Sequence, residues 1–261
     1  MSCSLLIDTK TKQCDSDADC AVFDNDSGSA TCSAEHVCLA ASGPLPAQGC
    51  EEPEQSSEDT VTLSFAVSLT SPPAKAADRK PFTIHACNTV DPTCDTPVTD
   101  DIRVAYGDMA QVELPPGFAG YLEVTNPDGL SAMEFLGRPI NQDTSGYDLI
   151  IPTPGTVQLL AQLADQTYSA DAGLFVVTTR DCDRQPLAGV TVQNTLGGTP
   201  FIFQNMLPQT SLTETNDEGA AGFINVPEGI GSVSATLAGR AMTGTSAFSR
   251  AGWVSYVEIF P

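Results

Sequence analysis

At 261 residues, the chain is long enough for about two domains of typical size, each able to bury a core of its own. The 33 Asp and Glu residues outnumber the 11 Lys and Arg residues and give a net charge of -22, which argues against nucleic acid and anionic membranes as partners. Because 41% of the residues are hydrophobic and 7% are aromatic, the composition predicts a folded protein and not an acidic disordered segment.

Cysteines crowd the start of the chain, where six of the nine fall within the first 50 residues. Neither paired C-x-x-C ligands nor histidines at ligand spacing accompany them, as a cytosolic zinc site would usually require. The pattern therefore predicts disulfides and an oxidising, extracellular environment.

We expect residues 1–58 to form a cysteine-rich module that ends in an acidic linker, because so short a segment needs covalent bridges in place of a large core. Four of its cysteines allow three connectivities, of which we favour the interleaved one. The expected bridges are Cys14–Cys32, Cys20–Cys38, the local pair Cys87–Cys94 and, by elimination, Cys50–Cys182.

Cys3 is left outside these four bridges. Ser2-Cys3 resembles the end of a bacterial lipobox, in which case Cys3 would carry a lipid. An ordinary disulfide cysteine or a free thiol is the equally weighted alternative. No stretch of the sequence has the character of a transmembrane helix or a signal-peptide core.

Strict alternation of apolar and polar residues begins at Thr60 and predicts a half-buried strand over residues 60–69. Turn-forming residues separate six further candidates, and seven short strands suggest a β-sandwich at 59–152. The further candidates lie at 82–86, 102–106, 110–114, 121–125, 132–136 and 147–151.

A helix is expected at 157–164, where apolar residues recur at helical spacing after the capping sequence Thr153-Pro154. Residues 153–171 would then be a helical linker to a second sandwich at 172–261. Its candidate strands lie at 174–179, 190–193, 201–204, 212–215, 222–226, 233–237 and 253–260.

Two segments of the β regions match each other, QVELPPGF at 111–118 and FINVPEGI at 223–230. Both read as a strand followed by Pro, any residue, Gly and an apolar residue. A duplicated domain explains the match most simply, while chance is the alternative, because Pro and Gly are what any turn after a strand requires.

The second β region resembles the carboxypeptidase-regulatory-like, transthyretin-like β-sandwich family in PLAGVTV at 186–192 and in TNDEGAAGFINVPEG at 215–229. The run CDSDADC at 14–20 is similar to the short cysteine modules of myxobacterial surface lipoproteins. These resemblances imply a secreted or outer-membrane-anchored accessory protein and name no ligand. The expected fold class is mainly β, with two tandem transthyretin-like or immunoglobulin-like sandwich domains, a small disulfide-rich N-terminal module and one short linking helix.

No catalytic residues are assigned from the sequence. The two histidines, His36 and His85, fall in different predicted modules, which argues against a His-dependent nucleophile and against a multi-histidine metal centre. His85 is expected to face solvent from its strand. The enzymatic alternative is a secreted hydrolase that uses loop carboxylates, and it predicts a cleft with two close acidic groups, one of them with a raised pKa.

Calcium is the one cofactor that the sequence suggests. Alternating oxygen ligands occur at Asp15, Asp17 and Asp19 and again at Asp24 and Asp26, although the twelve-residue loop of an EF-hand is not completed. The alternative, which the preferences of Asp and Asn favour, is that these side chains form turns and caps.

The expected function is non-catalytic, as adhesion, scaffolding or ligand capture at the cell surface through exposed loops and sandwich edges. The expected partner is an extracellular protein or a polysaccharide, and a membrane is contacted only through a lipid on Cys3. The alternatives are the hydrolase and a structural subunit whose edge strands pair between copies.

Overall fold

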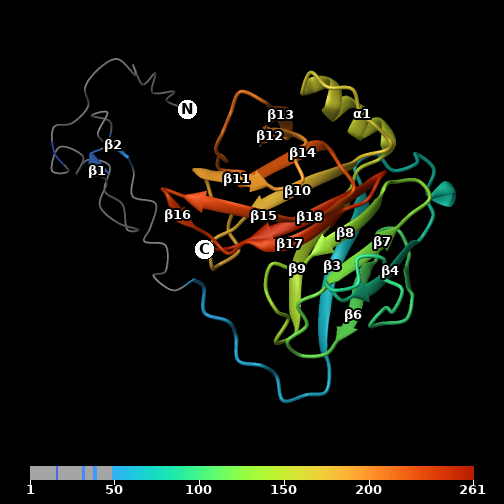
Figure 1. The fold of residues 1–261 in the computed structure, drawn as a ribbon. Helices are drawn as coiled ribbons and strands as arrows, with labels where there is room; N and C mark the ends of the chain where they lie inside the picture. Colours follow the sequence, from blue (N-terminus) through green and yellow to red (C-terminus); the bar gives the residue numbers. More distant parts are fainter. Residues whose placement is uncertain (1–15, 17–30, 33–37, 40–48) are drawn as a thin grey trace, which may run out of the picture. The chain divides into compact units, whose positions relative to one another are not determined.

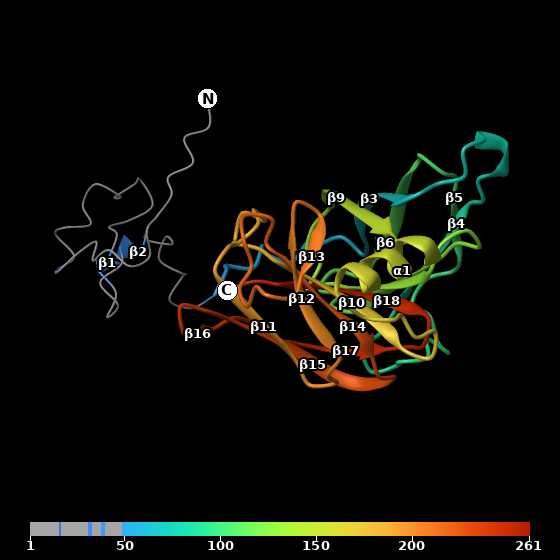
Figure 2. The same ribbon diagram turned by 90° about the horizontal axis from the view of Figure 1, so that it is seen from above.

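The computed structural model describes residues 16, 31–32, 38–39 and 49–261. The chain divides into two compact units, Met1–Gly49 and Cys50–Pro261. In the first unit, β1 (Thr31–Cys32) pairs antiparallel with β2 (Cys38–Leu39), so that Cys32 lies opposite Cys38. The second unit contains all the other described strands (Figures 1 and 2).

The first β region of this unit is a sandwich. Its strands are β3 (Val61–Leu69), β4 (Phe82–Cys87), β5 (Ile102–Val104), β6 (Met109–Leu114), β7 (Tyr121–Thr125), β8 (Ser131–Phe135) and β9 (Thr144–Ile151). One layer has the order β6-β3-β9, in which β3 is antiparallel to β6 and parallel to β9. The other layer has the order β5-β4-β7-β8.

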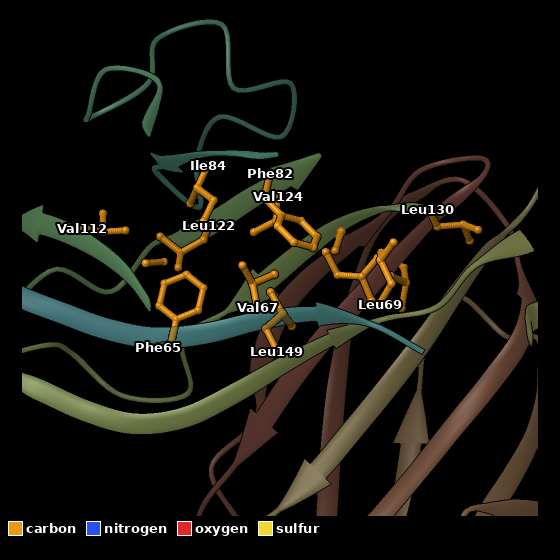
Figure 3. Close-up of a cluster of buried hydrophobic side chains, with 14 of the residues drawn as sticks. Phe65, Val67, Leu69, Phe82, Ile84, Val112, Leu122, Val124, Leu130 and Leu149 are labelled. Atoms are coloured by element: carbon orange, nitrogen blue, oxygen red, sulfur yellow. The ribbon is translucent and has the colours of Figure 1, made fainter. Parts of the chain in front are cut away.

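Alternation of side chains builds the core between these layers. Every second residue of β3 is buried, as the sequence predicts, and Phe65 at its centre is fully buried. Phe82 and Ile84 of β4 and Leu122 of β7 enter the same cluster from the opposite layer (Figure 3). Burial of a phenylalanine or leucine side chain contributes about 1.5–3 kcal/mol, so this cluster stabilises the first sandwich.

The second β region repeats this arrangement. Its strands are β10 (Gly173–Thr179), β11 (Val190–Asn194), β12 (Thr199–Gln204), β13 (Leu207–Gln209), β14 (Ala220–Val226), β15 (Gly229–Leu237), β16 (Arg240–Ala241), β17 (Thr245–Ser249) and β18 (Trp253–Ile259). β10 is antiparallel to β14 and parallel to β18, as β3 is to β6 and β9. β15 lies between β11 and β17, as β7 lies between β4 and β8.

The shared topology supports duplication over chance as the origin of the sequence match. Gly117 and Gly229, the matching turn glycines, both have positive φ values, 85° and 152°. Residues with a Cβ atom rarely adopt such values. The third strand of each repeat is the exception. In the first repeat β5 pairs with β4, whereas in the second repeat β12 pairs with β14.

A parallel pairing of β18 with β8 joins the two sandwiches into one nine-stranded sheet, with the order β13-β12-β14-β10-β18-β8-β7-β4-β5. Val254 lies opposite Ala132, and both enter the core that the β6-β3-β9 layer covers. Phe135 points to the other face, where its ring centroid lies 4.9 Å from that of Phe248 in β17. The two smaller sheets therefore cover opposite faces of the shared sheet (Figure 2).

Helix α1 (Pro154–Leu163) forms where the sequence predicts a helix. The side chain of Thr153 caps its first turn by accepting a hydrogen bond from the backbone N–H of Thr156. Val157 and Ala161 are buried and join the hydrophobic core. Within the described part of the chain, no helix is long and apolar enough to cross a bilayer. A short 3₁₀ helix, η2, covers Ala76–Asp78.

The mainly β fold class is confirmed, and one expected strand is corrected. Residues 212–215 form no strand, and the buried Thr215 hydroxyl instead accepts a hydrogen bond from the backbone N–H of Val190 and donates one to the carbonyl of Leu187. β13, β16 and β17 were not predicted, and in β17 the polar serines and threonine surround the buried pair Ala247 and Phe248. The acidic linker is exposed but anchored, as Ser56 donates a backbone hydrogen bond to the carbonyl of Asn141.

Candidate functional site

Two disulfides lie among the described residues. Cys50 is bonded to Cys182, and Cys87 to Cys94, with Cα atoms 5.3 and 5.5 Å apart. Both are pairings that the sequence analysis expects. The expected partners of Cys32 and Cys38, the lipid-bearing candidate and the calcium ligands lie outside the described residues; they are Cys14, Cys20, Cys3, Asp15, Asp17, Asp19, Asp24 and Asp26.

A pocket of about 410 Å³ opens at the seam between the repeats. Strands β8, β10 and β18 of the shared sheet contribute to its wall, and so does the edge strand β9. Glu134 and Glu258 supply carboxylates, while Arg180 and Arg184 supply guanidinium groups. The other lining residues are Gly146, Asp148, Leu149, Ile150, Val176, Thr178 and Tyr256.

Strand register brings the two carboxylates together. Glu134 of β8 lies opposite Tyr256 of β18 in the parallel ladder. Because alternate residues of a strand share a face, Glu258 points to the same side as Tyr256, diagonal to Glu134. The two glutamates are more than 120 residues apart in the chain, and nothing in either strand's own pattern predicts that β8 and β18 pair.

The environments of the two glutamates differ. Burial, with the charge of Glu258 adding to it, raises the pKa of Glu134 well above its ordinary value of 4.5, although Arg180 acts in the opposite direction. Glu258 accepts two ion pairs, from Arg180 Nε at 3.8 Å and from Arg184 Nη1 at 3.7 Å. Burial thus favours the protonated form of Glu134, which lies beside the carboxyl group that Arg180 and Arg184 contact.

Tyr256 also lines the pocket. Its hydroxyl donates a hydrogen bond to the carbonyl of Ile150 in β9. Burial raises the pKa of Tyr256, and the neighbouring Glu134 adds to the shift. The phenol therefore stays protonated and ties the edge of the first sandwich to the terminal strand of the second.

Glu134→Gln is expected to change how stability depends on pH. A raised pKa means that the folded protein holds the proton of Glu134 more tightly than the unfolded chain, in which the group titrates near 4.5. The stability gained from this proton is fully present below that pH and is lost as the pH rises through the raised pKa. The free energy of unfolding of the wild type should therefore fall below that of Glu134→Gln at alkaline pH and approach it in acid.

Denaturant unfolding of the wild type and Glu134→Gln, measured from acid to alkaline pH, checks the expectation. Glu113→Gln is the matched control, because Glu113 is an exposed carboxylate on a strand of the same sandwich. A difference between wild type and Glu134→Gln that does not vary with pH would contradict the expected role of burial.

A second cluster of charges lies on the opposite face of the shared sheet. The expectation that His85 faces solvent is wrong. Its Nε2 lies 3.2 Å from Glu123 Oε2, its Nδ1 lies 3.2 Å from Asp101 Oδ1, and its side chain is 20% exposed. Arg250, from the turn between β17 and β18, reaches Glu123 Oε1 at 2.5 Å. The second repeat thus supplies the cation that the sequence alone does not place near His85.

A larger hollow of about 620 Å³ lies beside β6 and the segment that precedes β5. Most of its lining residues are exposed, among them Asp59, Asp100 and Glu113. We place the candidate site in the smaller pocket because only there does a buried titratable group face the cavity among the described residues.

Comparison with known proteins leaves the family open. No family model and no curated protein matches the sequence. Among solved structures, S.CueP is 19% identical over 36% of this chain and 62% of its own, with a TM-score of 0.26. The minor pilin of Streptococcus agalactiae is 11% identical over 77% of this chain and 95% of its own, with a TM-score of 0.25.

The shaft pilin SpaA of Lactobacillus rhamnosus GG is also similar, at 10% identity over 77% of this chain and 98% of its own, with a TM-score of 0.24. Likenesses with such low TM-scores assign neither a fold family nor a function to the chain. The resemblance to carboxypeptidase-regulatory-like domains therefore stays a prediction, while the β-sandwich architecture itself is observed.

Proposed function

We propose that this chain is a non-catalytic protein of the cell exterior that captures a neutral saccharide in the pocket at the seam of its two sandwiches. The observation that carries the proposal is the set of groups that face this pocket. The carboxyl group of Glu134, whose raised pKa favours its protonated form, and the guanidinium groups of Arg180 and Arg184 can donate hydrogen bonds to a ligand, and Glu258 can accept them. Sugar hydroxyls both donate and accept, so they match such a mixed lining.

The pocket also has the size and apolar surface that a sugar requires. Its volume of about 410 Å³ lies within the range of small-molecule sites, roughly 300–1,000 Å³. Leu149, Ile150 and Val176 also line the pocket, and their apolar side chains suit the apolar faces of a sugar ring. A net charge of -22 disfavours anionic polysaccharides, which leaves neutral ones as the expected class.

The location outside the cell rests on the cysteines. Disulfides persist in oxidising compartments, and Cys50–Cys182 and Cys87–Cys94 are two such bonds. Attachment to an outer membrane through a lipid on Cys3 belongs to the same proposal. The continuous nine-stranded sheet supports a scaffolding role, because it gives the binding pocket a rigid frame.

A hydrolase is the second candidate, and one observation favours it. The pocket holds Glu134, whose raised pKa favours a proton-donating carboxyl group, beside the carboxyl group of Glu258, and two carboxyl groups are what acid and base catalysis of glycosidic bond hydrolysis requires. The hydrolase alternative expected carboxylates on loops, whereas this pair lies on two central strands, β8 and β18. The ion pairs of Glu258 with Arg180 and Arg184 weigh against it, since these cations compete with a water molecule for the carboxyl oxygens that a general base would use.

Affinity electrophoresis of the full chain in gels that contain neutral polysaccharides tests the proposal. At least one polysaccharide should retard the wild type, Arg184→Ala should migrate faster, and Arg240→Ala, which removes an exposed cation outside the pocket, should not. Release of soluble sugar that disappears in Glu134→Gln would support the hydrolase instead. Unretarded migration of the wild type in every gel would contradict saccharide capture.

A further inference from the structure

Four residues with metal-binding side chains converge on one face of the first sandwich. They are His85, Cys87, Cys94 and Glu123, and their ligand atoms lie within 4.8 Å of one another. Imidazole, thiolate and carboxylate are the ligands that zinc prefers, in tetrahedral sites. Cys87 and Cys94 are joined as a disulfide, so the thiolates of this set become available only after reduction.

The strand pattern explains why these side chains meet. His85 and Cys87 are two residues apart on β4 and therefore share a face. Glu123 on β7 is the register partner of His85. Cys94 lies at the end of the short loop that follows β4, where its disulfide holds it beside Cys87, and its backbone φ of 53° is left-handed. Three backbone elements thus deliver four ligands to one point.

Two neighbours orient the imidazole and the carboxylate. Asp101 Oδ1 lies 3.2 Å from His85 Nδ1, which leaves Nε2 directed at the cluster. Arg250 binds Glu123 Oε1 and leaves Oε2 on the side of the imidazole. A carboxylate behind a ligating histidine is the usual outer-shell support of a metal site, and it fixes the ring and raises its basicity.

The loop from Cys87 to Cys94 is held by contacts other than the disulfide. The carboxylate of Asp91 accepts hydrogen bonds from the backbone and hydroxyl of Thr96. Tyr121 donates its hydroxyl proton to the carbonyl of Asp91, and Arg250 donates to the carbonyl of Pro92 at 3.0 Å. None of these hydrogen bonds involves the sulfur atoms, so we expect them to keep both sulfur atoms near His85 and Glu123 when the disulfide opens.

We propose that reduction of Cys87–Cys94 converts this cluster into a zinc site with two thiolates, His85 and Glu123 as ligands. A dithiol reductant supplies two electrons and two protons, becomes a disulfide itself and leaves two thiols on the protein. Zinc then displaces both thiol protons and binds Sγ of Cys87 and Cys94, Nε2 of His85 and Oε2 of Glu123. The oxidised protein lacks the thiolates and does not form the site.

Zinc stoichiometry of the full chain tests this inference. Protein reduced with a dithiol, desalted without oxygen and equilibrated with zinc should bind one zinc more than the Cys87→Ser/Cys94→Ser variant treated in the same way. Both proteins contain the remaining cysteines, so zinc bound by those cysteines does not contribute to the difference in stoichiometry. Cys50→Ser/Cys182→Ser should keep the additional zinc. Equal stoichiometry of the reduced wild type and Cys87→Ser/Cys94→Ser would overturn the proposal.

Asp101→Asn provides a test that leaves all ligands in place. Asp101 is 68% exposed, so the variant is expected to fold, which circular dichroism of the reduced protein checks. Loss of an outer-shell carboxylate typically weakens metal binding by about 10–100-fold, and competition with a chromophoric chelator should show that loss. Unchanged zinc affinity in Asp101→Asn would contradict the assignment of His85 as a ligand.

Discussion

Replacing Cys50 and Cys182 together by serine is expected to lower the free energy of unfolding by about 2–5 kcal/mol. The bond joins residues 132 positions apart, so it restricts the unfolded chain over half of its length. Both cysteines are half-buried, and serine should fit in their places without a steric penalty. Denaturant unfolding without reductant, compared between the variant and the wild type, measures the loss.

The local disulfide provides the control. Cys87 and Cys94 are only 7 positions apart, and closing so short a loop removes less entropy from the unfolded chain. Cys87→Ser/Cys94→Ser should therefore cost less stability than Cys50→Ser/Cys182→Ser. If the two double variants lose the same amount, the long-range bond does not act through the unfolded state as argued.

Arg250→Met is expected to destabilise the fold by about 3–5 kcal/mol, because it leaves a buried carboxylate without its cation. The side chain of Glu123 is 8% exposed and lies 2.5 Å from Arg250. The guanidinium also donates hydrogen bonds to Pro92 and Tyr121 in the first repeat and stacks on Trp253 in the second. One substitution therefore removes several contacts between the repeats.

Thermal and denaturant unfolding of three variants isolates this effect. Arg240→Met removes an exposed cation and should change stability by less than about 0.5 kcal/mol. Adding Glu123→Gln to Arg250→Met removes the uncompensated charge and should restore part of the loss. A stability of Arg250→Met equal to that of Arg240→Met would contradict the role of the buried pair.

Local features of the fold could be predicted from the sequence because they depend on near neighbours in the chain. The alternation around Phe65 predicts β3, and the cap at Thr153 predicts the start of α1. The matching turns at Gly117 and Gly229 indicate a repeat, whose shared topology the structure then shows. Each of these signals is carried by short segments of the chain.

The seam and the pocket depend on contacts that no local pattern encodes. β8 and β18 read as ordinary strands, and their parallel pairing is fixed only when two sandwiches pack together. Glu134 looks like an outward-facing carboxylate in its own strand and becomes buried through that pairing. For the same reason, the ion pair of Glu123 with Arg250 could not be expected from either repeat alone.

Isothermal titration calorimetry tests the central claim, that the pocket at the seam binds the ligand, most directly. The titrant is an oligosaccharide from a polysaccharide that retards the wild type, and the proteins are the wild type, Arg184→Ala and Arg240→Ala. Loss of a charged hydrogen bond costs about 1.5–3 kcal/mol, so Arg184→Ala should bind at least roughly tenfold more weakly. Arg240→Ala should bind as the wild type does. Equal affinities of the wild type and Arg184→Ala would contradict the claim.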